Sequence, residues 1–523
     1  MNSLRRKVDD LFKRSIAKTA GITELEPLHH RLLLVLRSLD SPMRVALVGK
    51  IKAGKSTLMN AFLGEDRVPT GNTETTFNVN WFCYSDQPNT TVYFLDGRTR
   101  EYDFSQLRDL TVRDANRGEF LRSIKHISVG YPNDLLKQFH LIDTPGLDSY
   151  YEADSKNTLQ FLGIKSEEVE QWTISAAGDA DAIVYLFSRT LTEYDISVMR
   201  RFHGGMRQMN AANAIGVLTK VDDYYPQEQD PMAKAMEIVH SSQQEHSILR
   251  QLFYTIQPIC GLLALGAQTL TPDEFKILQQ IAAFPGDVLE HSVWRKGQQA
   301  FSNRDFDNLP GFPSKTDRSQ LVSRLGLYGI KFACENIRSG LDFSAVKEAL
   351  FTASGVKQLR TVLSSHFGNR AFIIKLYNAL DDLRGLCFLE YQRCNGRTQE
   401  VVEEIATEIS EFIAKGHAFR ELEVLRNYYE GILPFNENEV QWMLAVTGEW
   451  GTSIYQRLGM AEGTAIETLY KEAEYRMAHF QQKAYTSCLS SREARDASEI
   501  LRDSFALILQ QLQQLEDNLY SWQ

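Results

Sequence analysis

The chain has 523 residues, enough for two or more substantial cores, because single domains usually contain roughly 100–200 residues. Its hydrophobic content of 43% and charged content of 24% are typical of folded globular proteins, and a formal net charge of −10 argues against nucleic acid as a partner, which requires basic surface. Its six scattered cysteines lack a CxxC pair, which argues against a disulfide framework or a zinc site and predicts a cytoplasmic protein.

The first 40 residues predict helices. Their apolar residues fall on two helical faces, Leu4, Val8 and Leu11 on one and Leu28, Leu32, Val35 and Leu39 on the other. Ser41-Pro42 then interrupts the pattern. We expect residues 1–40 to pack with the helices at the other end of the chain.

Any membrane contact is expected to be peripheral. No stretch approaches the roughly 18–20 apolar residues of a spanning helix, and the N-terminal residues lack the apolar core of a secretory signal. Residues 1–16 offer an alternative to packing, because they are rich in Arg and Lys and would suit a membrane surface, although two aspartates dilute their charge.

Between about residues 41 and 260, short apolar runs alternate with amphipathic stretches. Six runs predict buried strands, at residues 45–48, 127–130, 139–142, 182–187, 215–218 and 253–259. A hairpin around Asp96-Gly97 is predicted to join residues 91–95 to 100–104. The alternation indicates an α/β domain with a mixed, mostly parallel sheet.

The first strand runs directly into a phosphate-binding sequence of the GxxxxGK[ST] type. In such a turn the backbone N–H groups surround the phosphates, Lys55 reaches the β- and γ-phosphate oxygens, and Ser56 offers its hydroxyl to Mg²⁺. The residues predicted to contact a nucleotide here are Gly49, Lys50, Ile51, Lys52, Ala53, Gly54, Lys55, Ser56 and Thr57.

Two further segments are predicted to lie beside the γ-phosphate. Asp143 ends an apolar strand and begins Asp-Thr-Pro-Gly, so its carboxylate is expected to hold Mg²⁺ through water while the N–H of Gly146 meets the phosphate. Thr76, in a polar loop after Pro69, is the predicted third metal residue and switch threonine. Thr75 is the alternative, and an ordinary polar loop is a further one.

The segment Thr219-Lys220-Val221-Asp222 follows another apolar strand and predicts guanine recognition. A carboxylate at Asp222 accepts hydrogen bonds from N1–H and the exocyclic amine of guanine, a pattern that adenine does not offer, while the stem of Lys220 lies over the base. Cys260 and Gly261 follow the sixth strand and are predicted to back the base through main-chain groups. The expected ligands are therefore GTP or GDP with Mg²⁺.

Long helical periodicity replaces this alternation after about residue 370. One heptad-like seam carries Leu501, Phe505, Ile508, Leu512, Leu515 and Leu519. Similar seams run through residues 373–387 and 402–412, and a glycine-interrupted helix is predicted through about 437–487. The pattern favours an elongated antiparallel, coiled-coil-like bundle, with a compact helical domain as the alternative.

These motifs together resemble those of the bacterial dynamin-like GTPases. The features that carry the resemblance are Thr219 in place of the usual asparagine, Pro69-x-Gly71 before the switch threonine, and residues 354–367 as a helix closing the GTPase domain. Residues 258–265, 325–330 and 417–422 are similar to the isoniazid-inducible Ini proteins, especially their shorter IniC-like branch.

The resemblance implies a P-loop GTPase domain over residues 41–368 and a helical neck or trunk over residues 369–523, joined by the helices of residues 1–40. Hinges are expected near Ser41-Pro42 and around residues 368–370, where short loops are expected to join the two units. It implies GTP hydrolysis coupled to self-association through the GTPase domains and to membrane binding or remodelling at the inner face of the plasma membrane. The alternative is a regulatory GTPase whose helices dock on a sister dynamin-like protein without touching lipid.

Two departures from the family limit these expectations. Eukaryotic dynamins place a glutamine and a serine where this chain has Ile51 and Lys52, and isoleucine has no polar group to orient water. Lys50 or Lys52 is a candidate for the positive charge of the transition state, the alternative being that both face solvent or an anionic partner. The expected catalytic residues are Lys52, Lys55, Ser56, Thr76 and Gly146.

The second departure is that no long apolar paddle is evident. The best candidates for a membrane-facing tip are residues 429–435 and 442–450. Burial of Trp442 and Leu444 in a helical core is the preferred prediction for these segments.

Overall fold

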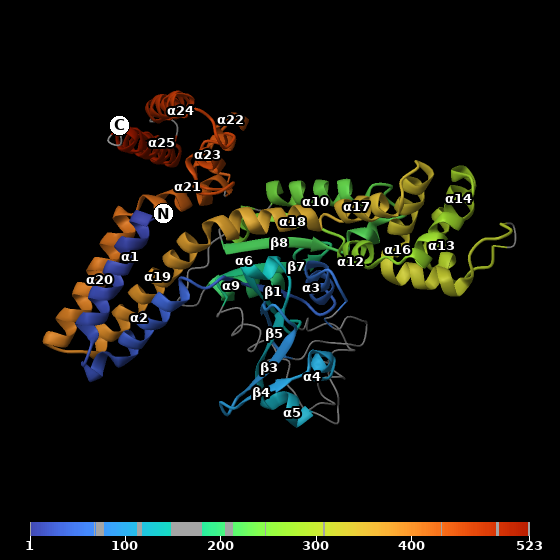
Figure 1. The fold of residues 1–523 in the computed structure, drawn as a ribbon, viewed down its shortest axis with the longest axis horizontal. Helices are drawn as coiled ribbons and strands as arrows, with labels where there is room; N and C mark the ends of the chain where they lie inside the picture. Colours follow the sequence, from blue (N-terminus) through green and yellow to red (C-terminus); the bar gives the residue numbers. More distant parts are fainter. Residues whose placement is uncertain are drawn as a thin grey trace.

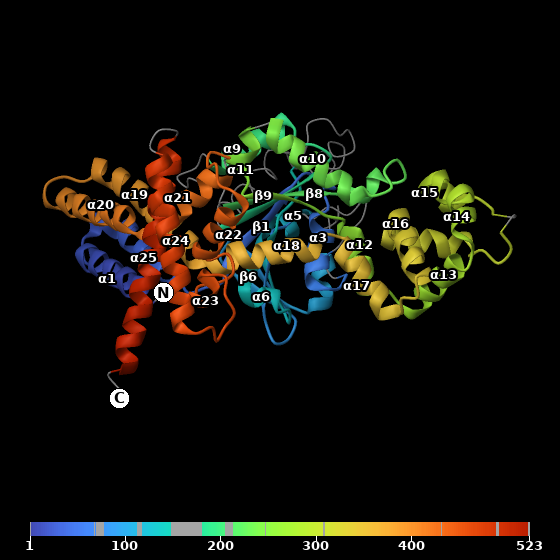
Figure 2. The same cartoon turned by 90° about the horizontal axis from the view of Figure 1, so that it is seen from above.

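The computed structural model describes residues 2–66, 68, 78–111, 118–147, 180–203, 213–245, 247–306, 309–429, 431–487 and 491–520. Figure 1 shows a central sheet with a helical insert at one end and two further groups of helices at the other. The view in Figure 2 gives the same order along the long axis.

A nine-stranded sheet forms the centre of the described chain. Its order is β4-β3-β5-β2-β6-β1-β7-β8-β9. The strands are β1 (Met43–Gly49), β2 (Asn80–Tyr84), β3 (Asn89–Phe94), β4 (Thr99–Tyr102), β5 (Ile124–Tyr131), β6 (Phe139–Asp143), β7 (Ala182–Ser188), β8 (Ala214–Thr219) and β9 (Thr255–Pro258). Pairs β2–β6, β3–β4 and β3–β5 are antiparallel and the other pairs are parallel, which confirms the predicted fold class. The hairpin at β3–β4 is also confirmed, whereas the prediction missed β2.

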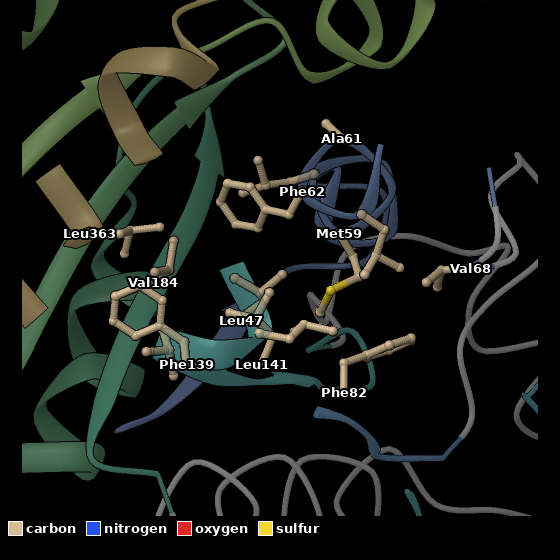
Figure 3. Packing of buried hydrophobic residues seen from close by; sticks show 14 of the residues in the cluster. Leu47, Met59, Ala61, Phe62, Val68, Phe82, Phe139, Leu141, Val184 and Leu363 are labelled. Carbon is tan, nitrogen blue, oxygen red and sulfur yellow. The ribbon is translucent and has the colours of Figure 1, made fainter. Parts of the chain in front are cut away.

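Both faces of the sheet are covered by helices, which is why the central strands are apolar throughout. On one face α3 (Lys55–Leu63), α12 (Gly261–Thr269) and α18 (Val356–Val362) enclose the first core. Figure 3 shows Met59 and Phe62 of α3 over Leu47 and Leu141 of the sheet. The other face carries α9 (Glu193–His203), α10 (Pro231–Glu245) and α11 (Ser247–Leu252). Three short helices complete the domain, α4 (Leu107–Thr111), α5 (Gly118–Ser123) and α6 (Leu135–Gln138), of which α6 packs on β2 and β6.

A helical insert with its own core follows β9, and the sequence did not predict it as a separate unit. After α12 it comprises α13 (Pro272–Ala282), α14 (Gly286–Ser292), α15 (Gly297–Asn303), α16 (Lys315–Arg338) and α17 (Phe343–Ala353). Trp294, Leu278 and Leu325 are buried in its centre. Helix α16 is interrupted at Gly326, whose φ of 65° and ψ of 170° are not helical.

The helix that leaves the sheet continues without a loop into the first of two helical cores. A π-helical turn, Leu363–Gly368, joins α18 to α19 (Asn369–Arg393), so the expectation of a short loop at residues 368–370 is wrong. Helix α19 packs with α20 (Arg397–Lys415), α1 (Asn2–Thr19) and α2 (Glu26–Ser38) around buried Val8, Leu380 and Ile405. The N-terminal helices therefore join the later helices as predicted, and the apolar face of α1 is buried among them.

The second helical core is separate from the first and contains α21 (His417–Tyr429), α22 (Glu437–Val446), α23 (Ile454–Arg457), α24 (Ile466–Ser487) and α25 (Arg492–Tyr520). The single helix predicted through residues 437–487 is wrong, because Gly448 and Gly451 adopt positive φ and separate α22 from α23. The seam of α25 is buried at Phe505, which stacks on Phe480 of α24 with ring centroids 6.0 Å apart. Within the described residues, no helix is long and apolar enough to cross a membrane.

A buried ion pair connects this second core to the sheet. Nη1 of Arg370 donates to Oε2 of Glu449 at 2.6 Å, and Nε of Arg370 donates to the carbonyl oxygen of Thr447 at 2.9 Å. The hydroxyl of Tyr254, which lies just before β9, donates to the same oxygen of Glu449 at 3.1 Å. The ring of Tyr254 also stacks on His366 of the π-helical turn. Three parts of the chain thus meet at one guanidinium.

Candidate nucleotide-binding site

The phosphate-binding sequence forms a tight turn between β1 and α3. Gly49 approaches the carbonyl oxygen of Leu186 on β7 so closely that a Cβ atom would clash with it. Gly54 is the N-cap of α3 and has φ of 91°, in the left-handed region that favours glycine. The sequence of glycines therefore shapes a loop at the N-terminus of a helix, where backbone N–H groups attract anions.

Lys55 lies inside this loop and is almost fully buried. Its Nζ donates to the carbonyl oxygens of Gly49 at 2.9 Å and Lys50 at 3.0 Å. Burial lowers the pKa of Lys55 to about 8, while the negative charge of Asp143 acts in the opposite direction. The ammonium is thus held by neutral loop carbonyls, and a phosphate would offer it stronger, charged acceptors.

The segment after β6 is bonded directly to the loop. The N–H of Leu147 donates to the carbonyl oxygen of Gly49, and the N–H of Ile51 donates to the carbonyl oxygen of Leu147, both at 3.1 Å. A Cβ on Gly146 would lie 2.7 Å from Cγ1 of Ile51, so only glycine fits there. Ile51 therefore packs against the Asp143-Thr-Pro-Gly146 turn and holds two parts of the site together.

The two other lysines of the loop have different surroundings. Nζ of Lys50 forms an ion pair with buried Asp195 of α9 at 3.1 Å and donates to Oγ1 of Thr192 at 3.0 Å. Asp195 also accepts a hydrogen bond from the hydroxyl of Tyr185 at 2.7 Å. Lys50 therefore lies against a carboxylate of its own chain. Lys52 is exposed and has φ of 61°.

Thr219 connects the base-recognition segment to the phosphate loop. Its hydroxyl lies 2.9 Å from the carbonyl oxygen of Ala53 and 3.1 Å from that of Phe187 at the end of β7. Lys220, which follows, has φ of 57°, and the next four residues form the single turn Val221–Tyr224. The hydroxyl of Thr219 thus joins this segment to the phosphate loop and to the end of β7.

Asp222 is held on two sides. The thiol of Cys260 donates to its Oδ1 at 3.1 Å, and a Cβ on Gly326 of the helical insert would lie 3.1 Å from its Oδ2. Burial raises the pKa of Asp222, and the hydrogen bond from Cys260 opposes that rise. The interruption of α16 at Gly326 therefore lets the insert reach the carboxylate that is predicted to recognise the base.

The backbone groups of Cys260 are hydrogen-bonded within the chain. The N–H of Cys260 donates to the carbonyl oxygen of Ser354 at 2.8 Å, and its carbonyl oxygen accepts from the N–H of Ala264 at 3.1 Å. Its side chain, rather than its backbone, reaches the site. Gly261 lies nearby, with a Cβ position 3.5 Å from Cγ2 of Thr57.

The donor set fits a hard divalent cation such as Mg²⁺, which prefers oxygen ligands. Ser56 is in the first turn of α3, and the Asp143 carboxylate is fully buried at the end of β6, close enough to Lys55 to act on its pKa. Next to Asp143 the structure buries the carboxamide of Asn80, whose Oδ1 and Nδ2 have no hydrogen-bond partner among the described residues. The predicted Thr75 and Thr76 lie outside the described residues.

Sequence reasoning missed Asp195 and Asn80. Asp195 follows Thr192 at the start of a helix, and the N–H of Thr192 donates to its carboxylate at 2.8 Å, a local pattern that resembles any helix start. Asn80 opens a strand that was not predicted. For neither residue did the sequence contain a signal specific to a nucleotide site.

Comparison with known proteins agrees with this geometry. Residues 45–221 match the family model described as the Dynamin family. The chain is 29% identical over 438 residues to the isoniazid-induced protein IniC of Mycobacterium tuberculosis, an alignment that covers 82% of each protein. It is also 31% identical over 168 residues to dynamin-like protein 2 of Campylobacter jejuni, covering 31% of this chain and 27% of that protein.

A similarity to solved structures extends along most of the chain. A structure titled "An oligomerised bacterial dynamin pair provides a mechanism for the long range sensing and tethering of membranes" aligns with 98% of this chain and 91% of its own, at 14% identity and a TM-score of 0.33.

Proposed function

The protein is a dynamin-like GTPase with a dynamin-family domain at residues 45–221, and on this premise we propose that it hydrolyses GTP with Mg²⁺ and couples the reaction to movement of its helical cores. The observation that carries the proposal is the arrangement of Lys55 inside the loop. A buried ammonium with a lowered pKa, held only by loop carbonyls in the contacts described above, is suited to exchange them for phosphate oxygens.

Different residues around the loop are proposed to bind the phosphates and the Mg²⁺. The loop N–H groups and Lys55 bind the β- and γ-phosphates, and Ser56, Asp143 and Thr76 would hold Mg²⁺. When bound, the cation neutralises charge that develops between these phosphates. Gly146 lies close to Ile51 of the loop, and its N–H is proposed to meet the γ-phosphate.

Lys52 is the proposed source of positive charge in the transition state. Lys50 is already paired with Asp195, so its use would break a partly buried ion pair, whereas Lys52 is exposed. In single-turnover assays Lys52→Ala is expected to slow hydrolysis with nucleotide affinity retained. An unchanged rate would remove Lys52 from the mechanism.

The base is proposed to be guanine, recognised by Asp222 with Lys220 over its face. Cys260 supports this pose by orienting one oxygen of Asp222. The other oxygen faces Gly326, so the helical insert forms a wall beside the recognition carboxylate.

Coupling to the helical cores is supported by one further contact. Nη2 of Arg360 on α18 donates to the carbonyl oxygens of Ala61 at 2.7 Å and Phe62 at 2.8 Å, at the C-terminal end of α3. Helix α3 begins at Lys55, and α18 continues through the π-helical turn into α19. A shift of the phosphate loop would therefore reach the first helical core through two helices joined by Arg360.

The target of this movement is proposed to be a membrane surface bound peripherally by a self-associated form. The family supports this target, and the C-terminal aromatic segments do not add to it, because Trp442 packs against His479 and Phe480 in the second helical core. Because this packing removes Trp442 as a side chain that could enter lipid, it favours a second candidate function. In that function the helical cores dock on a protein partner, such as a sister dynamin-like protein.

Vesicle co-sedimentation with parallel GTPase assays tests the proposal. The purified protein is mixed with anionic vesicles, with and without a non-hydrolysable GTP analogue, and Lys55→Ala serves as the variant deficient in phosphate binding. Analogue-dependent binding of the wild type, absent in Lys55→Ala, supports membrane coupling. Mg²⁺-dependent GTP hydrolysis without vesicle binding would contradict it and favour the protein partner.

A further inference from the structure

Asn80, the first residue of β2, is a polar side chain buried without compensation. It is 0% exposed, and neither its Oδ1 nor its Nδ2 has a hydrogen-bond partner among the described residues. A buried amide left in this condition costs roughly 1–3 kcal/mol. An apolar residue would suit this strand position better, so the polar group needs an explanation.

The neighbours of Asn80 point to the nucleotide site. Asn80 pairs with Asp143 across the antiparallel β2–β6 ladder, and Phe82 pairs with Leu141 two residues further along. Side chains alternate along a strand, so Asn80 shares the face of Phe82, and Asp143 shares the face of Leu141. Directly opposed residues in such a ladder have Cβ atoms about 4.5–5.5 Å apart.

That shared face is the one covered by α3. Phe82, Leu141 and Leu47 belong to the same core as Met59 of α3, and Figure 3 shows them together beneath that helix. Leu47 is also the parallel partner of Asp143 on β1. The carboxamide of Asn80 therefore lies beside Asp143, on the side of the sheet from which Lys55 and Ser56 approach.

We propose that Asn80 is a positioning residue of the nucleotide site, whose carboxamide holds the water through which Asp143 reaches Mg²⁺. An amide suits this task because it both donates and accepts hydrogen bonds and remains neutral at all relevant pH values. The inference rests on the proposed function, since it assigns a further residue to the same metal site.

The proposal separates the stability of the protein from its metal-dependent binding. Replacing a buried, unsatisfied amide by a similar apolar group removes a cost, so Asn80→Leu should leave the melting temperature of the nucleotide-free protein unchanged or raised. The same change should weaken binding only when Mg²⁺ is present.

Thr90 on β3 provides a matched control. It is 1% exposed, its Oγ1 likewise has no partner among the described residues, and β3 is separated from β6 by β5 and β2. Thr90→Val therefore removes a comparable buried polar atom away from Asp143.

The experiment measures the affinity of a fluorescent, non-hydrolysable GTP analogue with Mg²⁺ and with EDTA, for the wild type, Asn80→Leu and Thr90→Val. We expect Asn80→Leu to reduce the Mg²⁺-dependent gain in affinity roughly three- to tenfold, the value of about one hydrogen bond, and to leave binding in EDTA unchanged. Thr90→Val should match the wild type in both conditions. Asn80→Ala repeats the test if the leucine does not fold.

The outcomes separate this inference from the proposed function. If the wild type shows no Mg²⁺-dependent binding, the proposed function fails. If the wild type shows it and both Asn80 variants retain the full gain, only the inference about Asn80 is overturned. A loss of equal size with Mg²⁺ and with EDTA would also overturn it, because a purely structural role predicts that result.

Discussion

The nucleotide site and the junction around Arg370 both bury charge, and they do so in opposite ways. At the nucleotide site Lys55 is held by neutral carbonyls with a lowered pKa, and the amide of Asn80 has no described partner. At the junction the guanidinium of Arg370 meets a carboxylate, a carbonyl and a hydroxyl. The first region is built to receive further polar groups, whereas the second is already satisfied and fixes the position of a helical core.

This difference separates a region that can receive further polar groups from one that fixes the arrangement of the helices. A buried ion pair contributes little net stability compared with apolar packing, but it specifies one geometry strongly. The junction lies at a π-helical turn, an element that often occurs at functional sites, and it links Tyr254 near the sheet to Glu449 in the second helical core. It is therefore suited to fix one arrangement of the helical cores.

The largest predicted effect is at the junction. Arg370→Ala leaves Glu449 partly buried without its cation, and we expect the free energy of unfolding to fall by about 3–5 kcal/mol. Urea denaturation followed by circular dichroism measures this. Lys471→Ala, which breaks an exposed pair with Glu467, is the control and should cost about 0–1 kcal/mol. Equal effects of the two substitutions would contradict the contrast between the junction and an ordinary surface.

The next effect concerns the uncompensated charge of Lys55. The unfolded chain keeps the proton of this lysine up to about pH 10.5, but the folded protein keeps it only up to about pH 8. The unfolded state thus binds more protons between these values, so the free energy of unfolding rises with pH in this window. Below about pH 8 the lysine is protonated in both the folded and the unfolded state, so folding still carries the full cost of burying its charge.

Comparing the nucleotide-free wild type with Lys55→Met isolates this contribution. Between pH 7.5 and 10 the wild type should gain up to about 3 kcal/mol relative to the variant. Denaturant titrations across the range provide the measurement. If the free energies of unfolding of the wild type and of Lys55→Met changed in parallel with pH, the charge of Lys55 would be paired as fully as that of Arg370. The contrast between the nucleotide site and the junction would then be removed.

The smallest effect is expected for Thr219, a satisfied group inside the nucleotide site. Thr219→Val removes the hydroxyl that reaches the carbonyl oxygen of Ala53 and should cost about 0.5–1.5 kcal/mol of stability. Thermal denaturation and nucleotide titration measure the two consequences. Thr219→Ser, which keeps the hydroxyl, should behave more like the wild type, and identical losses in both variants would argue against the hydrogen bond.

Much of the fold was predictable because apolar runs and glycine patterns are local. The six predicted strands lie within or overlap observed ones, and the N-terminal helices pack as expected. Strand β2 was missed because Asn80 and Trp81 open it and its apolar face is short. The helical insert was missed because helical periodicity does not show which helices enclose a core of their own.

The site was predictable to the extent that its sequence is contiguous. Gly49, Lys55 and Gly146 have conformations or contacts that follow from their motifs. The pairs Lys50–Asp195 and Arg370–Glu449 join residues far apart in the chain, and periodicity contains no information about such polar contacts. For Cys260 nothing in the sequence indicated that its thiol reaches Asp222 while its amide is bonded to Ser354.

Nucleotide preference after Asp222→Asn tests the central claim most directly. A carboxylate at residue 222 accepts from both guanine donors, whereas a carboxamide accepts from N1–H and donates to the 2-oxo group of xanthine. In competition binding the wild type should prefer GTP to ATP and XTP, and Asp222→Asn should prefer XTP to GTP, each by roughly tenfold or more. Equal binding of ATP and GTP by the wild type, or an unchanged GTP preference in the variant, would contradict the account.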